Sequence, residues 1–239
     1  MELKKPALSG STLKIMALAI MLIDHVGAVI VQRTMWMPGF ERDFWNSLYL
    51  PLRYVGRLAF PIFCFLLVEG YVHTSDVKKY IRRMLLFALI SEIPFDLAIT
   101  GKLIDLNYQN VFLELAFGIG AMFCLELVEN NLNNYFLQVI SRIGVIAVFA
   151  IAAESFNFDY GLYGIISIVA LYAFRQNKMM QLLAGAISFC WEPVAPWAFF
   201  IIAFYNGKRG RKLKYIFYAF YPAHLLFLYV IARVMGCQY

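Results

Sequence analysis

The sequence predicts an all-α membrane protein, a polytopic bundle of about nine transmembrane helices. Of its 239 residues, 62% are hydrophobic and 15% are charged, and the mean hydropathy is +0.68. A water-soluble domain is nearer half apolar and a quarter charged. The apolar residues also gather in separate segments that approach the ~20 residues a helix needs to cross a bilayer. The aromatic content of 17%, including 22 Phe, suits a surface that faces lipid.

Nine apolar segments follow one another along the chain. The first begins near Ser11 and Thr12, whose hydroxyl groups can cap a helix, and ends near Val31. Residues 32–54 read as a loop whose Trp and Tyr side chains suit the membrane interface, long enough to hold a re-entrant or interfacial element. The further expected spans are 56–73, 84–100, 111–128, 139–153, 162–174, 179–190, 193–204 and 215–234. Several are shorter than a straight crossing requires, and the seventh and eighth can instead form one re-entrant hairpin.

The positive charges in the loops predict the orientation in the membrane, because Lys and Arg collect on the cytoplasmic side. With the N-terminus inside, fifteen of the 21 basic residues fall on that side: Lys4, Lys5, Lys14, Lys78, Lys79, Arg82, Arg83, Arg142, Arg175, Lys178, Lys208, Arg209, Arg211, Lys212 and Lys214. The outer side receives Arg33, Arg42, Arg53, Arg57, Lys102 and Arg233. We therefore expect a cytoplasmic N-terminus and an outer C-terminus.

Charge and cysteine usage exclude two kinds of partner. The net charge of +6 lies mostly in short loops, where it sets topology, so it does not indicate a nucleic-acid partner. The four cysteines lack CxxC or CxxH spacing, so no metal site is expected and they read as small residues packed in membrane helices. No long soluble segment is present, so residues 1–239 are expected to form a single membrane domain.

An ionisable pair, Asp24 and His25, lies deep in the first span. A charge in hydrocarbon costs several kcal/mol unless it is partnered or hydrated, so such residues mark candidate functional sites. Lys14 precedes His25 by eleven residues. That is close to three helical turns, so the two side chains share one face, roughly 16 Å apart along the axis.

Further polar residues are expected within or at the ends of other spans. With this topology most of them fall in the outer half of the membrane: Arg57, Glu92, Asp96, Asn110 and His224. Glu92 and Asp96 are four residues apart and so share one helical face. A carboxylate, an imidazole and an arginine in one leaflet supply a general base, its orienting group and an anion clamp.

Other interpretations of these residues stay open. Buried polar groups in helix bundles often only bond one another, and Arg57 is equally a candidate ion-pair partner of Asp24 or Asp96. Carboxylates and histidines in series can also relay protons in an ion- or proton-coupled small-molecule transporter. Transporters often contain internal repeats, and none is visible in this sequence.

Four blocks of the sequence resemble the TraX family: LSGSTLKIMALAIMLIDHVGAV, GRLAFPIFCFLLVEGYVHTSDVKKYIRRMLLFALISEIPFDLA, YQNVFLELAFG and FYPAHLLFLYV. Together they reach over nearly the whole chain. The family is named for the F-pilin acetylase, which acetylates the N-terminal amine of pilin. The resemblance implies a multi-pass acetyltransferase of the bacterial cytoplasmic membrane that uses acetyl-CoA, with N-acetylation favoured over O-acetylation.

The first span also resembles a wider group of membrane acyltransferases. That group includes sugar O-acetylases with an Arg, a ten-residue gap and a His, and the lysosomal heparan-glucosaminide N-acetyltransferase. Lys14 and His25 have this gap, with Lys in place of Arg. Arg and Lys differ in how they bind phosphate, because only the guanidinium is a planar fork.

The residues and the resemblance together predict where acetyl-CoA binds. It approaches from the cytoplasm, and its phosphates meet the inner basic rim. Lys14 is expected nearest the chemistry, and the further candidates are Lys78, Lys79, Arg82 and Arg83. The acceptor stays open among a pilin or peptide amine, a sugar and a small amine.

The predicted chemistry centres on His25 as general base toward the acceptor amine or hydroxyl. Asp24, or Glu92 with Asp96, is expected to orient the imidazole, and an acetyl-histidine intermediate is a second route. The oxyanion of the tetrahedral intermediate would be stabilised by Arg57 or Asn110. His224 is either a second acid–base group or an orienting group.

Overall fold

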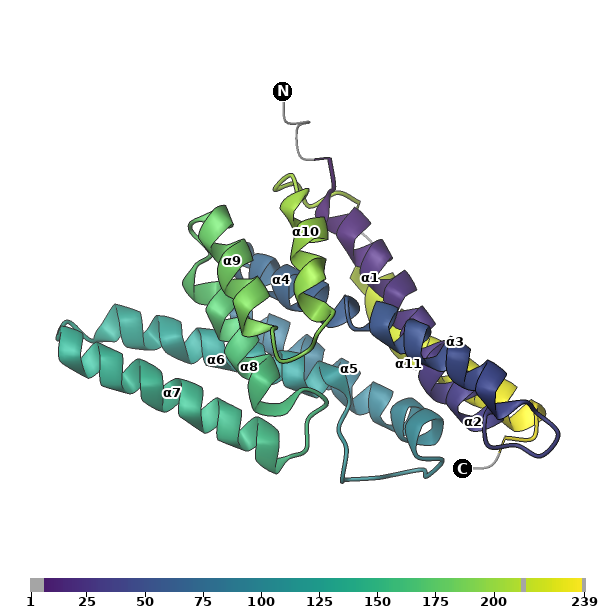
Figure 1. Cartoon of the computed structure of the whole chain (residues 1–239). Coiled ribbons are helices and arrows are strands. Elements are labelled where there is room, and N and C mark those ends of the chain that lie inside the picture. The colour runs from purple at the N-terminus through teal and green to yellow at the C-terminus, as the bar shows by residue number, and fades with distance from the viewer. Residues whose placement is uncertain (1–6, 212–213, 238–239) are drawn as a thin grey trace, which may run out of the picture. The chain divides into compact units, whose positions relative to one another are not determined.

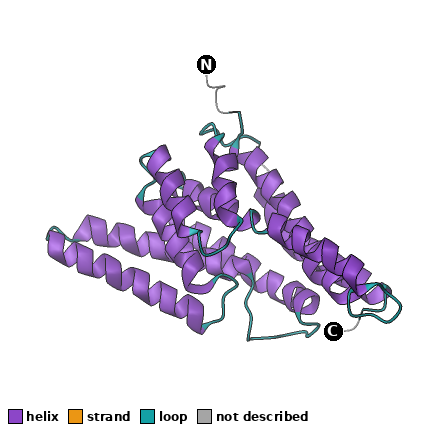
Figure 2. Ribbon diagram, in the orientation of Figure 1, coloured by secondary structure: helices purple, strands orange, loops and turns teal. Residues whose placement is uncertain are grey.

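The structure, a computed structural model, describes residues 7–211 and 214–237. Helices joined by loops make up this part of the chain, and Figure 2 draws no strand in it. Two isolated β-bridges, Leu8 with Tyr205 and Gln109 with Phe158, are the strand-type pairings there. The all-α prediction is confirmed. Lys4, Lys5 and Lys212, which the topology prediction uses, lie outside the described residues.

The helices follow in the order labelled in Figure 1. Their bounds are α1 Gly10–His25, η1 Val26–Val31, α2 Gln32–Thr34, α3 Arg42–Gly56, α4 Ala59–Val72, α5 Val77–Ile99, α6 Val111–Asn131, α7 Tyr135–Ser155, α8 Gly161–Ala173, α9 Lys178–Ser188, η2 Ala195–Trp197, α10 Ala198–Ala203 and α11 Lys214–Val234. Five helical stretches of the described chain are long and apolar enough to cross a membrane: Gly10–Thr34, Arg42–Val72, Val111–Asn131, Tyr135–Ser155 and Tyr215–Val234. They correspond to the first, second, fourth, fifth and ninth predicted spans.

The expected seventh and eighth spans are short helices. α9 has 11 residues and α10 has 6, so at 1.5 Å per residue they extend only about 16 Å and 9 Å. Neither alone matches a hydrocarbon core of about 30 Å. The prediction of nine spans is therefore met in part, by a polytopic helical membrane protein with five long candidate spans.

The segment 32–54, predicted as a loop with room for an interfacial element, contains a long helix. Arg42–Gly56 forms the 15-residue helix α3, which also contains Pro51. Its polar residues fall at helical spacing among apolar ones, so the segment can lie as a helix with one apolar face. The second candidate span therefore begins at Arg42 instead of residue 56.

The chain divides into two compact units. Unit 1 comprises residues 1–63, 90–105 and 190–239, and unit 2 comprises residues 64–89 and 106–189. Most of the intramembrane candidates named from the sequence belong to unit 1. Asn110 and the cluster 78–83 belong to unit 2. That all 239 residues form a single functional domain stays a prediction.

In unit 1, α3 and α11 both pack against α1 and its continuation η1 (Figure 1). The helices α1 and α11 run in the same direction. At their starts, the Gly10 amide donates to the Lys208 carbonyl at 2.8 Å, and at their far ends the Thr34 hydroxyl lies 3.9 Å from the Cys237 sulfur. Successive spans cross the membrane in opposite directions, so two spans that run in the same direction have an odd number of other spans between them in the sequence. The predicted first and ninth spans meet this condition.

The start of α1 is capped by Ser9. Its hydroxyl accepts a hydrogen bond from the Thr12 amide at 3.2 Å, so the cap lies before the predicted Ser11 and Thr12. Ser11 Oγ instead accepts from the Arg211 amide at 3.0 Å. The basic loop 207–211 therefore lies against the first turn of α1.

In unit 2, α6, α7 and α8 pack against one another, and α9 packs on α8. Gly164 allows a close approach of α8 to α6, because a Cβ there would overlap the Glu114 carboxylate. Cys64 is buried in this unit, and all four cysteines are free thiols.

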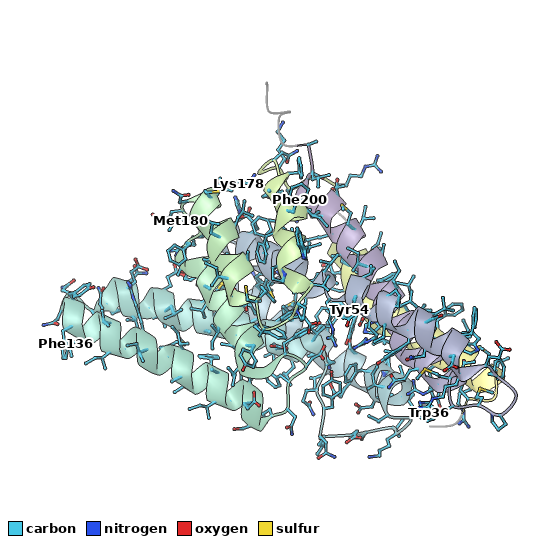
Figure 3. The ribbon with its side chains drawn as sticks, viewed as in Figure 1. Trp36, Tyr54, Phe136, Lys178, Met180 and Phe200 are labelled. Atoms are coloured by element: carbon cyan, nitrogen blue, oxygen red, sulfur yellow. The ribbon has the colours of Figure 1, made fainter. Side chains whose placement is uncertain are left out.

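Large apolar side chains cover the outside of both units. Figure 3 labels Trp36, Tyr54, Phe136 and Phe200 among them. The side chains of Phe136 and Phe200 are 69% and 70% exposed. Monomeric soluble proteins rarely expose so much contiguous apolar surface, whereas lipid covers it in a bilayer. The protein is a multi-pass membrane protein.

Candidate active site

Two histidines from opposite ends of the chain meet where α1 packs on α11. Nδ1 of His25 lies 2.7 Å from Nε2 of His224, and the two rings stack with their centroids 4.9 Å apart. Nδ1 of His224 lies 2.7 Å from the carbonyl oxygen of Phe220. Three groups therefore form a hydrogen-bonded chain from the backbone of α11 to the imidazole of His25.

This chain determines where the protons lie when both rings are neutral. A carbonyl oxygen only accepts, so Nδ1 of His224 carries a hydrogen and its Nε2 must accept. The donor to that Nε2 is then Nδ1–H of His25. The remaining nitrogen of His25, Nε2, consequently holds a lone pair and can accept a proton.

Aromatic rings fix the two imidazoles in place. Phe220 stacks on His224 at 4.8 Å between centroids. Tyr221 meets both imidazoles edge-on, at 5.9 Å from His25 and 5.7 Å from His224. Such ring pairs have preferred geometries and restrict ring rotation, so His25 keeps one orientation.

A π-helical turn follows His25 directly. Residues Val26–Val31 form η1, and single π turns inside α-helices are rare and frequent at functional sites. The guanidinium of Arg33 donates to the carbonyls of Ala28 and Val29, each at 3.1 Å. It also donates to the Ile99 carbonyl at 2.8 Å and so ties this turn to the end of α5.

Asp24 forms an ion pair with Arg53 of α3. Its Oδ2 lies 2.7 Å from Nη1, and the side chains are 16% and 22% exposed. Two glycines allow this approach of α3 to α1. A Cβ on Gly56 would overlap the Asp24 side chain, and a Cβ on Gly27 would come within 3.1 Å of Cβ of Leu52.

Arg57 pairs with a different carboxylate. Its Nε lies 3.6 Å from Oε2 of Glu192, in the turn that precedes η2. A pairing of Arg57 with Asp24 or Asp96 was one of the alternatives left open; the ion pairs seen are Asp24 with Arg53 and Arg57 with Glu192. Sequence reasoning missed Arg53 as a site residue. Its four-residue spacing from Arg57 was the available signal, because it puts both on one face of a helix.

Asp96 has a local partner. The side chain is fully buried, and its Oδ2 accepts from the Asp105 amide at 2.8 Å. This bond holds the loop after α5 against the helix, and Glu92 lies one turn earlier in α5. The orienting hydrogen bond to His25 was expected from Asp24, Glu92 or Asp96. In the described chain it comes from His224.

In unit 2, Asn110 caps α6. Its Oδ1 accepts from the Phe112 amide at 3.0 Å, and its Nδ2 donates to the Ala88 carbonyl at 2.9 Å. One turn later, the fully buried Glu114 accepts from the Tyr160 amide at 2.9 Å. Glu114 was not among the predicted residues, although a carboxylate within the apolar run FLELAFG could have identified it.

The expected cofactor-binding cations lie in both units. In unit 1, Nζ of Lys14 lies 5.5 Å from the centre of the Phe217 ring of α11. In unit 2, Lys78 and Arg82 are exposed on the first turns of α5, and Arg83 lies 5.7 Å from the centre of the Tyr80 ring.

Asp76 caps the helix that carries the unit 2 cations. Its Oδ1 accepts from the Lys79 amide at 2.8 Å, and its Oδ2 lies 3.2 Å from Nζ of Lys79. The backbone hydrogen bond from Lys79, with help from its ammonium, lowers the pKa of Asp76 from its usual value. The ammonium of Lys79 therefore already pairs with the Asp76 carboxylate. Lys78 and Arg82 are the other exposed cations of this helix.

Comparison with known families decides the relationship. The family model described as TraX protein matches residues 9–232. The chain belongs to the TraX family. This confirms the resemblance expected from the sequence blocks. The TraX family is associated with pilin acetylation.

A curated bacterial relative covers nearly the same length. It is named "Probable fimbrial assembly protein FimC, serogroup H1", from Dichelobacter nodosus. It is 27% identical over 243 aligned residues, which cover 92% of this chain and 94% of the relative. No solved structure matches this TraX chain. Among the residues that the structure describes, no group of three or more His, Cys, Asp or Glu side chains could hold a metal ion.

Proposed function

We propose that this TraX protein is a membrane-embedded acetyltransferase that moves an acetyl group from acetyl-CoA to an acceptor amine, with His25 as general base. The observation that supports this most strongly is the chain from the Phe220 carbonyl through His224 to His25. It leaves Nε2 of a neutral imidazole ready to accept a proton, and it supplies the orienting partner that such a base needs.

One proton moves during the acetyl transfer, and His25 alone can carry it from the acceptor amine to the CoA thiolate. The acceptor nitrogen attacks the thioester carbon, and Nε2 of His25 takes the proton that the nitrogen loses. The imidazolium keeps its Nδ1–H bond to His224, which is stronger when the donor is charged. As the C–S bond breaks, His25 returns the proton to the CoA thiolate. The products are the acetylated acceptor and CoA.

His224 acts as the orienting group in this proposal. Its Nε2 faces His25 and its Nδ1 faces the Phe220 carbonyl. Both nitrogens are therefore occupied, and neither is left to exchange a proton with a substrate. These contacts favour the orienting role over the acid–base role, the two roles that the sequence left open for His224.

Acetyl-CoA binds, we infer, from the cytoplasmic side at the start of α1. Because α1 and α11 run in the same direction, their starts face the same side of the membrane, and the loop charges predict that this side is the cytoplasm. The loop that carries Lys208, Arg209 and Arg211 is bonded to the first turn of α1, so these cations join Lys14 as candidate phosphate ligands. The roughly 16 Å from Lys14 to His25 along α1 is comparable to the length of a pantetheine arm. The candidates of unit 2 are Lys78, Lys79, Arg82 and Arg83.

The acceptor class that we favour is the N-terminal amine of a pilin-like protein. The family is associated with pilin acetylation, and the curated relative is named for fimbrial assembly. A sugar hydroxyl and a small amine are the acceptor classes that the same chemistry would also serve.

The test is acetyl transfer by purified protein in nanodiscs, from acetyl-CoA to a synthetic pilin N-terminal peptide with a free α-amine, read by mass spectrometry. His25→Ala is expected to abolish transfer. The matched control is His73→Ala, because His73 is exposed just past the end of α4, where its Nδ1 lies 2.8 Å from the Glu69 carbonyl oxygen. Near-normal transfer by the His25→Ala protein would overturn the proposed mechanism.

The transporter alternative makes the opposite prediction. Liposomes containing the protein would show proton flux driven by a pH gradient in the absence of acetyl-CoA. Acetyl-CoA would then not raise the apparent melting temperature of the protein, as a ligand that binds the native state must. Flux without binding would replace the enzyme proposal with transport.

A further inference from the structure

Arg53 has hydrogen-bond donors that the ion pair with Asp24 does not use. The guanidinium carries five N–H groups in a planar fork. In the described part of the chain, Nη1 alone is engaged, by Oδ2 of Asp24 at 2.7 Å. Nε and Nη2 have no hydrogen-bond partner there, and the side chain is 22% exposed. Two donor edges of a fixed cation are thus open to a ligand.

The position of Arg53 is set by backbone packing on both sides. α3 passes close to α1 at Gly27, where a Cβ would lie 3.1 Å from Cβ of Leu52 and 3.5 Å from Cδ of Arg53. At Gly56, a Cβ would overlap the Asp24 side chain, so this glycine lets α3 approach Asp24. The ion pair then holds the guanidinium of Arg53 beside Asp24, the residue next to His25.

The base His25 on α1, and the cation Arg53 that α3 holds against the neighbouring Asp24, meet the two demands of acyl transfer. One group takes a proton from the nucleophile, and the other stabilises the negative charge that develops on the carbonyl oxygen. A guanidinium suits the second task better than an ammonium, because its planar fork offers parallel donors to one oxygen.

We propose that Arg53 donates hydrogen bonds from Nε and Nη2 to the carbonyl oxygen of the acetyl group and stabilises the oxyanion of the tetrahedral intermediate. This rests on the proposed acetyltransferase function. When the acceptor nitrogen attacks, the C=O electron pair moves to the oxygen that Arg53 holds. When the C–S bond breaks, the pair returns to re-form the carbonyl and the thiolate leaves. Asp24 is the positioning residue that keeps Arg53 at this angle.

Arg53 fits this role better than the two residues expected from the sequence. The Nε of Arg57 faces the Glu192 carboxylate. The amide nitrogen of Asn110 is bonded to the Ala88 carbonyl, where it joins α6 to α5. Of the three, Arg53 is the one whose ion pair is with the residue next to His25.

The test is infrared spectroscopy of acetyl-CoA labelled with ¹³C at the carbonyl, bound to the full-length protein in nanodiscs. Hydrogen bonds to a carbonyl oxygen weaken the C=O bond and lower its stretching frequency. The wild-type protein and Arg42→Gln are expected to shift the band down, while Arg53→Gln leaves it at its solution frequency. Arg42 is the matched control, because it belongs to the same helix and lies over the Trp36 ring at 3.9 Å.

Each outcome decides the matter. A band that shifts equally in Arg53→Gln and wild type overturns the role of Arg53 and leaves acetyl-CoA binding intact. If acetyl-CoA binds saturably to the wild-type protein but its C=O stretching frequency does not shift, the role of Arg53 is also overturned. A binding isotherm that shows no saturation contradicts the proposed function itself. If Arg53→Gln aggregates, Arg53→Lys keeps the charge beside Asp24 and is expected to give a smaller shift, so a full shift there refutes the proposal.

Discussion

Substitution of Gly56 by alanine probes the contact between α1 and α3 that holds the candidate site. A Cβ at this position would overlap the Asp24 side chain, so α3 must move away or Asp24 must leave Arg53. Overpacking of this kind costs roughly 1–3 kcal/mol. The matched control is Gly144→Ala in α7, where a Cβ meets nothing within 4 Å. Alanine is favoured over glycine in a helix interior by about 1 kcal/mol.

The two variants should therefore differ in stability. Gly56→Ala is expected to be less stable than Gly144→Ala by roughly 1–3 kcal/mol, the overpacking cost, because both substitutions replace a helical glycine by alanine and the gain in helix propensity largely cancels. Unfolding of both proteins in the same detergent, followed by circular dichroism, measures the difference. Equal midpoints for the two variants would refute the close contact between Gly56 and Asp24.

Three further predictions concern separate parts of the account. His224→Gln removes the orienting ring, so kcat should fall by about 10²-fold or more while KM for acetyl-CoA changes little; a rise in KM alone would contradict an orienting role. Lys14→Ala should weaken acetyl-CoA binding in a thermal-shift titration and leave binding of dephosphorylated pantetheine unchanged, and equal loss for both ligands would argue against a phosphate contact. The lowered pKa of Asp76 means that its capping contribution is complete above the ordinary carboxyl pKa of about 3.9 and is lost as the pH falls through the lower native pKa. After correction for the intrinsic exchange rate, amide exchange at Lys79 should therefore quicken only at acid pH, and Asp76→Ala should show that quickening already at neutral pH.

Composition predicted much of the helical architecture, because it acts locally. A span is apolar along its own length, and recognising it needs no tertiary contact. The short helices α9 and α10 show the limit of this reasoning. The apolar composition of a segment does not by itself determine how long its helix is.

Helix α3 was missed because its charges and Pro51 read as an interfacial loop. The packing of Gly27 and Gly56 against its side chains comes from tertiary structure, and that packing turns Arg53 toward α1. The ion pair with Asp24 joins residues 29 positions apart. Sequence spacing within one helix cannot show such a pair.

The histidine pair shows both what the sequence can predict and what only the fold reveals. His25 and His224 could each be named from the cost of a titratable group in a membrane span. Their hydrogen bond joins residues 199 positions apart and depends on α1 and α11 running side by side. The acceptor of the second imidazole, the Phe220 carbonyl, is a backbone atom with no sequence signature.

The protonation pattern of His25 tests most directly whether this imidazole is the general base. The chain has three histidines, so ¹⁵N-histidine NMR in nanodiscs, with His73→Ala to remove one signal set, resolves the other two. We expect that neutral His25 carries its proton on Nδ1 and presents an unprotonated Nε2. A neutral His25 with its proton on Nε2 would contradict His25 as the general base.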